Sequence, residues 1–236
     1  PETVEEDSSI FCVTGDWRAA HPDAHAGILI MNTVENPSAH PELEKRKRSL
    51  ENDLRAQFSG QDAHALDGHG PIPAYSAYYR QFKKSYPVQG QLASIIFKGR
   101  SIPSVAALVE AMFVAELKNG LLTAGHDLDR LQLPVTLRAA SGEERYTLLG
   151  GQEQTLKAGD MFMADRQGVI SSIIYGPDQR TQIHSATRNV LFAVYAPAGI
   201  AASTVRAHLE DIRNLVQIVS PRAAVRLMHV FSAQPA

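Results

Sequence analysis

Residues 161–175 read MFMADRQGVISSIIY and hold two apolar runs, Met161 to Ala164 and Val169 to Tyr175. Turn signals border both runs, because Ala158-Gly159-Asp160 precedes them and Gly176-Pro177-Asp178 follows them. Short apolar runs bounded by glycine, proline and aspartate are typical of β-strands joined by tight turns. The same alternation continues from Leu133 to Pro197 and predicts a sheet with further strands at Pro134 to Ala139, Tyr146 to Leu149 and Val190 to Tyr195.

Helical spacing is the main pattern on either side of this region. Apolar residues recur every three or four positions, and prolines stand where first helical turns are expected. The tyrosines that follow Ala74 share this spacing, which favours a place in the core over a platform for stacked bases. The spacing predicts helices at Pro41 to Phe58, from Ala74, from about Gln89 to Lys98, from Ser101 to Lys118, and from Ser203 to Val216 with Ser203 or Thr204 as its cap.

Strands are also expected at both ends of the chain. Apolar runs at Ser9 to Thr14 and Ala26 to Val34 predict two strands with a loop from Gly15 to Asp23 between them, and Val225 to Phe231 predicts a last strand. A largely helical N-terminal half that leads into a strand-rich C-terminal half indicates an α+β fold. We expect the helical half to pack on the strand-rich half in a single domain over residues 1–236.

Composition limits the classes of function. The chain has 236 residues, 44% of them hydrophobic, and a formal net charge of −2, so no global positive field favours nucleic acid and any RNA contact must be local. No apolar run approaches the roughly 20 residues of a membrane span. The start, Pro1 to Asp7, is acidic, unlike a signal peptide, and the single Cys12 fits a reducing compartment. We expect a cytoplasmic protein.

One dense basic run, Lys45-Arg46-Lys47-Arg48, lies in the first long predicted helix. It is either a solvated helix face or a patch that contacts RNA phosphates. The nine histidines lack the spacing of metal ligands, and no cysteine pair is present, so we expect no metal and no cofactor. No Gly-x-Ser-x-Gly elbow or phosphate-binding loop occurs, and Gly150-Gly151 is expected to form a hairpin turn.

The segment from Ala124 to Leu131 combines an imidazole, carboxylates and a guanidinium just before the first strand of the sheet region. Asp129 could orient His126, and an imidazole that titrates near neutral pH suits the positioning of a water or a hydroxyl. The alternative is a polar, hydrogen-bonded turn that links a helix to a strand. In the first case, loss of His126 should reduce the activity of the site and leave the fold intact, because the residue is expected in a turn.

A series of short motifs in this region resembles the tRNA-editing module of the phenylalanyl-tRNA synthetase β subunit, which its third and fourth domains form. His126 and Asp129 are similar to its His-x-x-Asp signature, which leads into a strand that bears an arginine, here Arg138. The remaining motifs follow in the same order. They are Leu108 to Ala111 upstream, the Gly142-Glu143 turn, Leu148 to Gly151, Met161 to Asp165, Ile174-Tyr175-Gly176 and Thr187-Arg188-Asn189-Val190-Leu191.

This resemblance implies a layered β-sandwich with flanking helices at residues 101–236, preceded by a leader at residues 1–100 of the kind found in freestanding versions. It also implies a pocket that hydrolyses a mischarged amino acid from tRNA without a metal or a covalent intermediate. His126 and Asp129 would be catalytic, with His126 touching the terminal ribose or the water. The implied substrate-binding positions are Arg138, Glu143, Tyr175, Gly176, Thr187, Arg188 and Ala193.

Ala193 is a departure, since a glutamate that recognises the tyrosine hydroxyl stands at this place in the synthetase. A pocket that hydrogen-bonds a hydroxyl rejects the analogue without it by about 10⁴–10⁵, so a smaller or apolar side chain fits better here. Nothing in the chain indicates ATP binding or amino-acid activation. Three hypotheses stay open: a hydrolase of aminoacyl-tRNA, a noncatalytic module that binds tRNA, or a binder of a small amino-acid-like ligand. The oligomeric state is not predicted.

Overall fold

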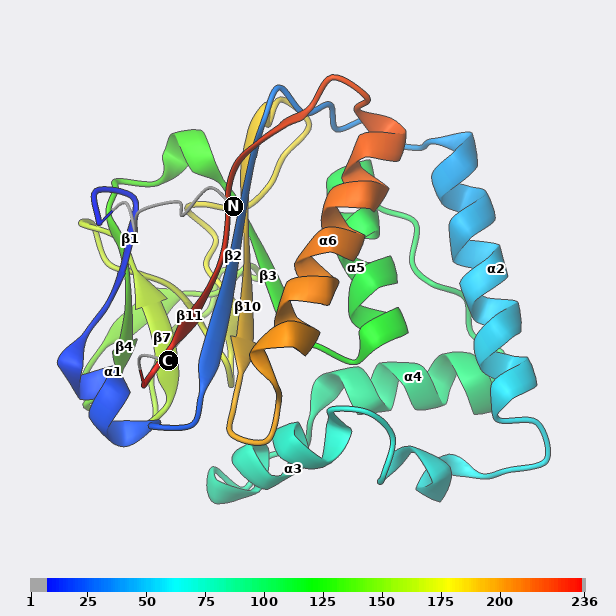
Figure 1. The fold of residues 1–236 in the computed structure, drawn as a ribbon, viewed down its shortest axis with the longest axis horizontal. Helices are drawn as coiled ribbons and strands as arrows, with labels where there is room; N and C mark the ends of the chain where they lie inside the picture. The colour runs from blue at the N-terminus through cyan, green and yellow to red at the C-terminus, as the bar shows by residue number, and fades with distance from the viewer. Residues whose placement is uncertain (1–7, 235–236) are drawn as a thin grey trace.

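The computed structural model describes residues 8–234, and the acidic segment Pro1 to Asp7 lies outside them. These residues form an α+β fold, as the sequence predicts. Figure 1 shows three layers: a sheet that contains β1, β4 and β7, a second sheet that contains β2, β10 and β11, and a layer of helices led by α5 and α6. The first sheet has the strand order β1-β4-β7-β8-β9, and the second has the order β11-β2-β10-β3.

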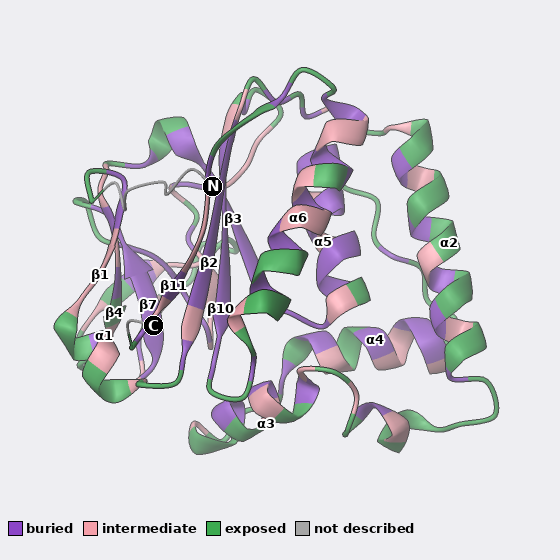
Figure 2. Cartoon of the chain, viewed as in Figure 1, coloured by how far each residue is buried: buried purple, intermediate pink, exposed green. Residues whose placement is uncertain are grey.

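The four-stranded sheet is antiparallel throughout and holds strands from both ends of the chain. Its members are β2 (His25–Asn32), β3 (Thr123–Asp127), β10 (Asn189–Ala196) and β11 (Ala224–Ser232). Most of β2 and β10 is buried on both faces, because sheet covers one side and helices the other (Figure 2). Residues before 100 therefore supply a central strand of the sheet that carries His126.

In the five-stranded sheet, β1 pairs with β4 in parallel and the other neighbours are antiparallel. Its strands are β1 (Phe11–Val13), β4 (Val135–Ala139), β7 (Met161–Ala164), β8 (Val169–Ser172) and β9 (Gly176–Pro177). A hairpin of β5 (Arg145–Thr147) and β6 (Glu153–Thr155) extends beside it, and the sequence did not indicate β6. Its turn contains Gly150-Gly151, as predicted, and Gly151 has a φ of +86° that favours glycine.

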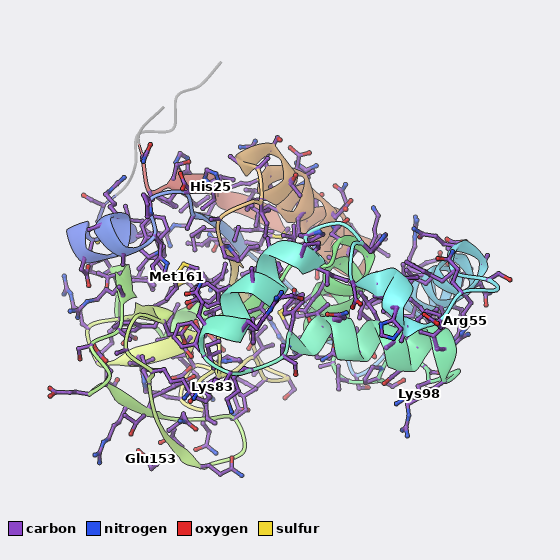
Figure 3. The ribbon with its side chains drawn as sticks, turned by 90° about the horizontal axis from the view of Figure 1, so that it is seen from below. His25, Arg55, Lys83, Lys98, Glu153 and Met161 are labelled. Atoms are coloured by element: carbon purple, nitrogen blue, oxygen red, sulfur yellow. The ribbon has the colours of Figure 1, made fainter. Side chains whose placement is uncertain are left out.

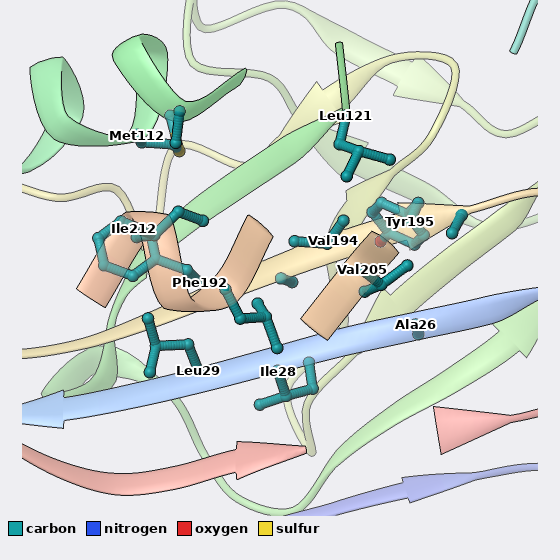
Figure 4. Close-up of a cluster of buried hydrophobic side chains, with 14 of the residues drawn as sticks. Ala26, Ile28, Leu29, Met112, Leu121, Phe192, Val194, Tyr195, Val205 and Ile212 are labelled. Carbon is teal, nitrogen blue, oxygen red and sulfur yellow. The ribbon is translucent and has the colours of Figure 1, made fainter. Parts of the chain in front are cut away.

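Two helices, α5 (Ala107–Asn119) and α6 (Ala202–Val219), pack on the outer face of the four-stranded sheet. The other helices are α2 (Pro41–Gln57) and α4 (Pro87–Phe97), which pack against other helices, and α3 (Ile72–Gln81). Figure 4 shows Met112 of α5 and Val205 and Ile212 of α6 among side chains of β2 and β10. The approach of α6 is close, because a Cβ on Gly27 would lie 2.6 Å from Val205 Cγ1. The helix-facing side of the sheet is thus part of the main core.

Three local predictions are wrong. Helix α5 begins at Ala107, six residues after the expected start at Ser101, because carboxylates hold the preceding backbone extended: Ile102 N donates to Glu51 and Val105 N to Glu110, both at 2.8 Å. Helix α6 has Ala201 at its N-cap and no side-chain cap. The expected loop after β1 contains a short helix, α1 (Gly15–Ala20).

The aromatic stripe lies in the core, as predicted. Tyr75, Tyr78, Tyr79 and Tyr86 are buried, and the rings of Tyr75 and Tyr86 stack at a centroid distance of 4.2 Å. Buried phenols need hydrogen-bond partners. Tyr78 Oη donates to Asp160 at 2.6 Å and Tyr86 Oη to the Gly120 carbonyl at 2.8 Å. The stripe therefore joins α3 to the sheets instead of offering a stacking surface.

Glu116 of α5 carries a pH-dependent part of the stability. It is 4% exposed, and its Oε2 accepts the Thr123 N–H at 2.9 Å. Burial raises the pKa of this carboxyl from 4.5 to about 8. The folded state therefore keeps a proton on Glu116 that the unfolded state loses above pH 4.5. The contribution of this side chain to the free energy of unfolding is complete below pH 4.5 and is lost as the pH rises toward 8.

We expect Glu116→Gln, which is neutral at every pH, to be more stable than the wild type by about 2–3 kcal/mol at pH 7. The difference should disappear near pH 4, where both side chains are uncharged. Urea unfolding at the two pH values measures it. A difference of the same size at both values would show that the variant acts through packing and not through the proton.

Candidate functional site

His126 lies in strand β3 and is fully buried, so the prediction of a turn is wrong at this residue. Its Nδ1 is 2.8 Å from Thr181 Oγ1, and the Thr181 hydroxyl donates to Asp178 Oδ1. Nδ1 is also 3.8 Å from the same Asp178 oxygen. We call these three residues the histidine relay. It joins β3 to the segment that follows β9, two parts of the chain about fifty residues apart.

The relay defines the protonation state of the imidazole. The Thr181 hydroxyl has a single hydrogen, which Asp178 accepts, so we infer that Thr181 Oγ1 accepts the Nδ1 hydrogen of His126. Nε2 then carries no proton, and it has no hydrogen-bond partner among the described residues. Burial lowers the pKa of His126 to about 3. The imidazole is therefore neutral at physiological pH and closed off from water.

Asp129 does not contact His126, in contrast to the prediction. It is exposed, and Asn189 Nδ2 donates to its two carboxylate oxygens at 3.1 and 3.0 Å. The buried carboxylate beside His126 is Asp127, whose Oδ2 accepts from Thr187 Oγ1 and His184 Nε2, each at 2.8 Å. The other ring nitrogen of His184 accepts the Ala186 N–H at 3.2 Å. Both ring nitrogens of His184 are thus engaged in holding the loop that leads into β10.

A pocket of about 260 Å³ opens at the outer end of the relay, between the β5–β6 hairpin, the β7–β8 turn and residues 178–180. Asp178 lines this pocket and also belongs to the relay. Arg180 Nη2 lies 2.7 Å from Asp165 Oδ1, so its guanidinium is held in place. Arg145 is exposed, and its guanidinium pairs with no other described residue. We call this space the Arg145–Arg180 pocket.

The remaining predicted substrate positions do not converge on one cavity. Arg138 is exposed on β4, with its guanidinium 5.6 Å from the Phe162 ring, and Glu143 is exposed in the turn after β4. Arg188 Nη1 donates to the carbonyls of Ser185 and Thr187, so its guanidinium holds the loop before β10.

One predicted position, Gly176, lies nearer the relay, and Tyr175 directly precedes it in the chain. Gly176 has a φ of +84°, and its carbonyl accepts from Tyr146 Oη at 2.7 Å. Tyr146 lines the Arg145–Arg180 pocket, which places Gly176 beside it. Tyr175 is half-buried, and Lys84 Nζ lies 5.9 Å from the centre of its ring. A role for these residues toward a substrate stays a prediction.

Ala193 is fully buried in β10, where it lies opposite Ala124 of β3 and Ile28 of β2. On the same strand, Tyr195 places its hydroxyl 2.6 Å from Ser171 Oγ and so spans the space between the sheets. Position 193 therefore carries no carboxylate, and its partners on the two neighbouring strands are apolar.

Three of the four residues in the basic run of α2 form ion pairs with glutamates. Lys47 is fully buried, and its Nζ lies 2.7 Å from Glu44 Oε1 and 3.1 Å from Glu110 Oε1. A buried, paired ammonium is not available to a phosphate, so the prediction of RNA contact is wrong for Lys47. Lys45 and Arg48 pair with glutamates of the same helix, at 2.6 and 2.8 Å. Arg46 is exposed and without such a pair, and RNA contact by these three residues stays a prediction.

Sequence reasoning did not find Asp178, Thr181 or Arg145. The polar run Asp178-Gln179-Arg180-Thr181 directly after a turn is a signal that could have drawn attention to this loop. Among residues 8–234, no group of three or more His, Cys, Asp or Glu side chains is placed to hold a metal ion. Within the same range no helix combines the length and apolar character of a membrane span.

Fold and site define a β-sandwich module with helices over one sheet and a buried histidine relay between strands. The sequence profile described as the B3/4 domain matches residues 73–214, which is more than half of the chain. The chain therefore belongs to the B3/4 domain family. This match confirms the resemblance to a module of the phenylalanyl-tRNA synthetase β subunit.

Curated relatives are similar over parts of the chain. The phenylalanine–tRNA ligase β subunit of Leifsonia xyli subsp. xyli is 33% identical over 128 residues, which are 52% of this chain and 15% of that protein. The corresponding subunit of Fusobacterium nucleatum is 37% identical over 68 residues, which are 29% of this chain and 8% of that protein. The chain thus matches about 15% or less of the length of these relatives.

A solved structure is also similar. It is an N-terminal fragment of the phenylalanyl-tRNA synthetase β subunit from Pyrococcus horikoshii, with 12% sequence identity and a TM-score of 0.47. The superposition covers 97% of this chain and 52% of that fragment.

Proposed function

We propose that this chain binds the acceptor end of tRNA, with or without an attached amino acid, and does not hydrolyse the ester. Membership of the B3/4 domain family and relatives named as tRNA ligase subunits support the choice of tRNA. The observation that carries the noncatalytic part is the complete burial of His126. The motifs that favoured hydrolysis depended on this imidazole and on the Asp129 carboxylate, which instead accepts hydrogen bonds from Asn189.

General-base catalysis of ester hydrolysis needs a side chain that reaches the attacking water within about 2.6–3.2 Å. His126 Nε2 faces no solvent, and its pKa near 3 makes it a weak base for a proton that must be removed near pH 7. His184 is half-exposed, but both of its ring nitrogens are occupied by Asp127 and the Ala186 N–H. Neither imidazole is therefore positioned to activate a water on an ester.

The Arg145–Arg180 pocket supplies the groups that RNA binding needs. Exposed guanidinium groups bind phosphate oxygens through charge-assisted hydrogen bonds, and such contacts position a nucleic acid without reading its sequence. Arg145 is free for this contact, while the exposed amide of Gln179 and the carboxylate of Asp178 offer partners for ribose hydroxyls. A volume of about 260 Å³ is small for a whole nucleotide and suits a phosphate with part of its ribose.

The test is the affinity for unfractionated tRNA as a function of salt concentration. We expect Arg145→Gln to weaken binding by roughly 3- to 10-fold and to reduce the slope of log K against log salt by about one, since one phosphate contact is lost. Arg222→Gln is the matched control, because Arg222 is 87% exposed at its side chain and lies in the turn after α6, outside the pocket.

Equal affinities and slopes for the two variants would remove the pocket from the interface. A wild-type protein that binds tRNA with no salt dependence would contradict phosphate recognition altogether. Binding that the Arg145 substitution weakens, while Arg222→Gln leaves it unchanged, is the result that supports the proposal.

A further inference from the structure

A second open space lies among the helices, away from the Arg145–Arg180 pocket. It is a half-open groove with a volume of about 450 Å³, bordered by α4, α5 and the extended segment before α5. This size falls in the range of small-molecule sites. No residue that lines it also lines the Arg145–Arg180 pocket. Its apolar lining comes from Pro87, Ile95, Pro103, Phe113 and Leu117.

Arg100 gives this apolar space a single charge. It is the ionisable side chain among the lining residues, and no described carboxylate pairs with its guanidinium. Gln91, Ser94 and Ser101 are the other polar residues that line the same space. An unpaired guanidinium beside apolar walls is complementary to a carboxylate with an apolar body.

Hydrogen bonds hold the backbone of the segment that carries Arg100 in place before any ligand binds. Arg55 Nη2 donates to the Arg100 carbonyl at 2.8 Å, and Arg55 Nε donates to the Ile95 carbonyl at 3.1 Å. The Arg100 N–H in turn donates to the Ser94 carbonyl at 3.1 Å. Figure 3 labels Arg55 close to Lys98, at the end of α4 where this segment begins. A held backbone reduces the entropy lost when a ligand binds.

Gly90 keeps the space open. It lies in the interior of α4, where glycine is less favourable than alanine, and its φ is an ordinary negative value. A Cβ at this position would meet no atom within 4 Å, so packing does not require glycine there. Gly90 is exposed and lines the space, so a longer side chain at this position would stand at its border.

We propose that the space between α4 and α5 binds a small carboxylate with an aromatic or branched apolar body. The apolar walls take the body, and Arg100 takes the carboxylate. This site does not depend on tRNA binding, since it shares no residue with the pocket assigned to RNA.

The test is titration of the purified chain with 3-phenylpropionate and with its neutral amide. Calorimetry and ligand-observed NMR measure the binding of each probe. We expect saturable binding of the acid and at least tenfold weaker binding of the amide, since a charge-assisted hydrogen bond is lost. Arg100→Gln should weaken binding of the acid at least tenfold and leave binding of the amide unchanged. Lys98→Gln is the control, because Lys98 is a nearby exposed cation that does not line the space.

Gly90→Leu places a bulky side chain at the border of the space and should weaken binding of both probes, with a thermal unfolding curve confirming that the variant is folded. The proposal is overturned if neither probe binds, if the acid and the amide bind equally, or if the Lys98 and Arg100 variants lose the same affinity. Undiminished binding by folded Gly90→Leu would also overturn it, because the probe would then bind elsewhere.

Discussion

Replacing Lys47 with methionine is expected to lower the free energy of unfolding by about 3–5 kcal/mol, although Lys47 belongs to a run of basic residues that resembles a surface patch. The reason is its partner. Glu110 is fully buried, and its Oε1 accepts from Lys47 Nζ at 3.1 Å. Methionine would fill a similar volume but leave the Glu110 carboxylate without a counter-charge in the core.

Urea unfolding of three variants tests this account. Lys47→Met alone should be strongly destabilised, and Lys47→Met with Glu110→Gln should recover a large part of the loss, because the orphan charge is removed. Lys45→Met is the matched control: its Nζ is paired with Glu42 on the exposed side of α2, and such pairs contribute about 0–1 kcal/mol. A Lys47 variant no less stable than the Lys45 variant would refute the buried network.

Replacing His126 with alanine is expected to lower the free energy of unfolding by about 3–5 kcal/mol at pH 7. The change leaves a cavity between β3 and the segment after β9, and it removes the hydrogen bond from His126 Nδ1 to Thr181 Oγ1. The sequence alone led to the opposite expectation, that loss of His126 leaves the fold intact, because the residue was expected in a turn. His64→Ala is the control, since the His64 side chain is 90% exposed.

The pH dependence of the His126 variant gives a second measurement. Burial lowers the pKa of His126 in the folded state from 6.5 to about 3, so the unfolded state binds the extra proton between these values. The contribution of His126 to stability is therefore complete above pH 6.5 and falls as the pH drops toward 3. The difference between wild type and His126→Ala should thus narrow at pH 4.5. A difference that stays constant from pH 7 to pH 4.5 would contradict a buried, neutral imidazole.

Much of the strand pattern could be predicted from the sequence. Strand β7 has the predicted bounds, Met161–Ala164, because a short apolar run between turn signals leaves few alternatives. The core position of Tyr75 and its neighbours followed from helical spacing alone. Local signals decide these elements, so a single sequence is sufficient for them.

The relay and the charged network depend on contacts between distant segments. Nothing near His126 in the sequence indicates that Thr181 and Asp178 reach it, since the contact arises only when β3 and β9 are brought together. The spacing of His126 and Asp129 indicated a pair, but β3 continues through Asp127 and directs Asp129 outward to Asn189. A basic run likewise does not reveal that one of its members, Lys47, is buried.

The rate of ester loss from aminoacyl-tRNA in the presence of this chain is the measurement that tests the proposed function most directly. A panel of tRNAs charged with different amino acids is incubated near pH 7 with protein at concentrations that saturate tRNA binding. The account predicts that each ester decays at its spontaneous rate or more slowly, because neither His126 nor His184 is placed to activate the water. Decay of any ester that accelerates in proportion to protein concentration would contradict the account and establish a hydrolase.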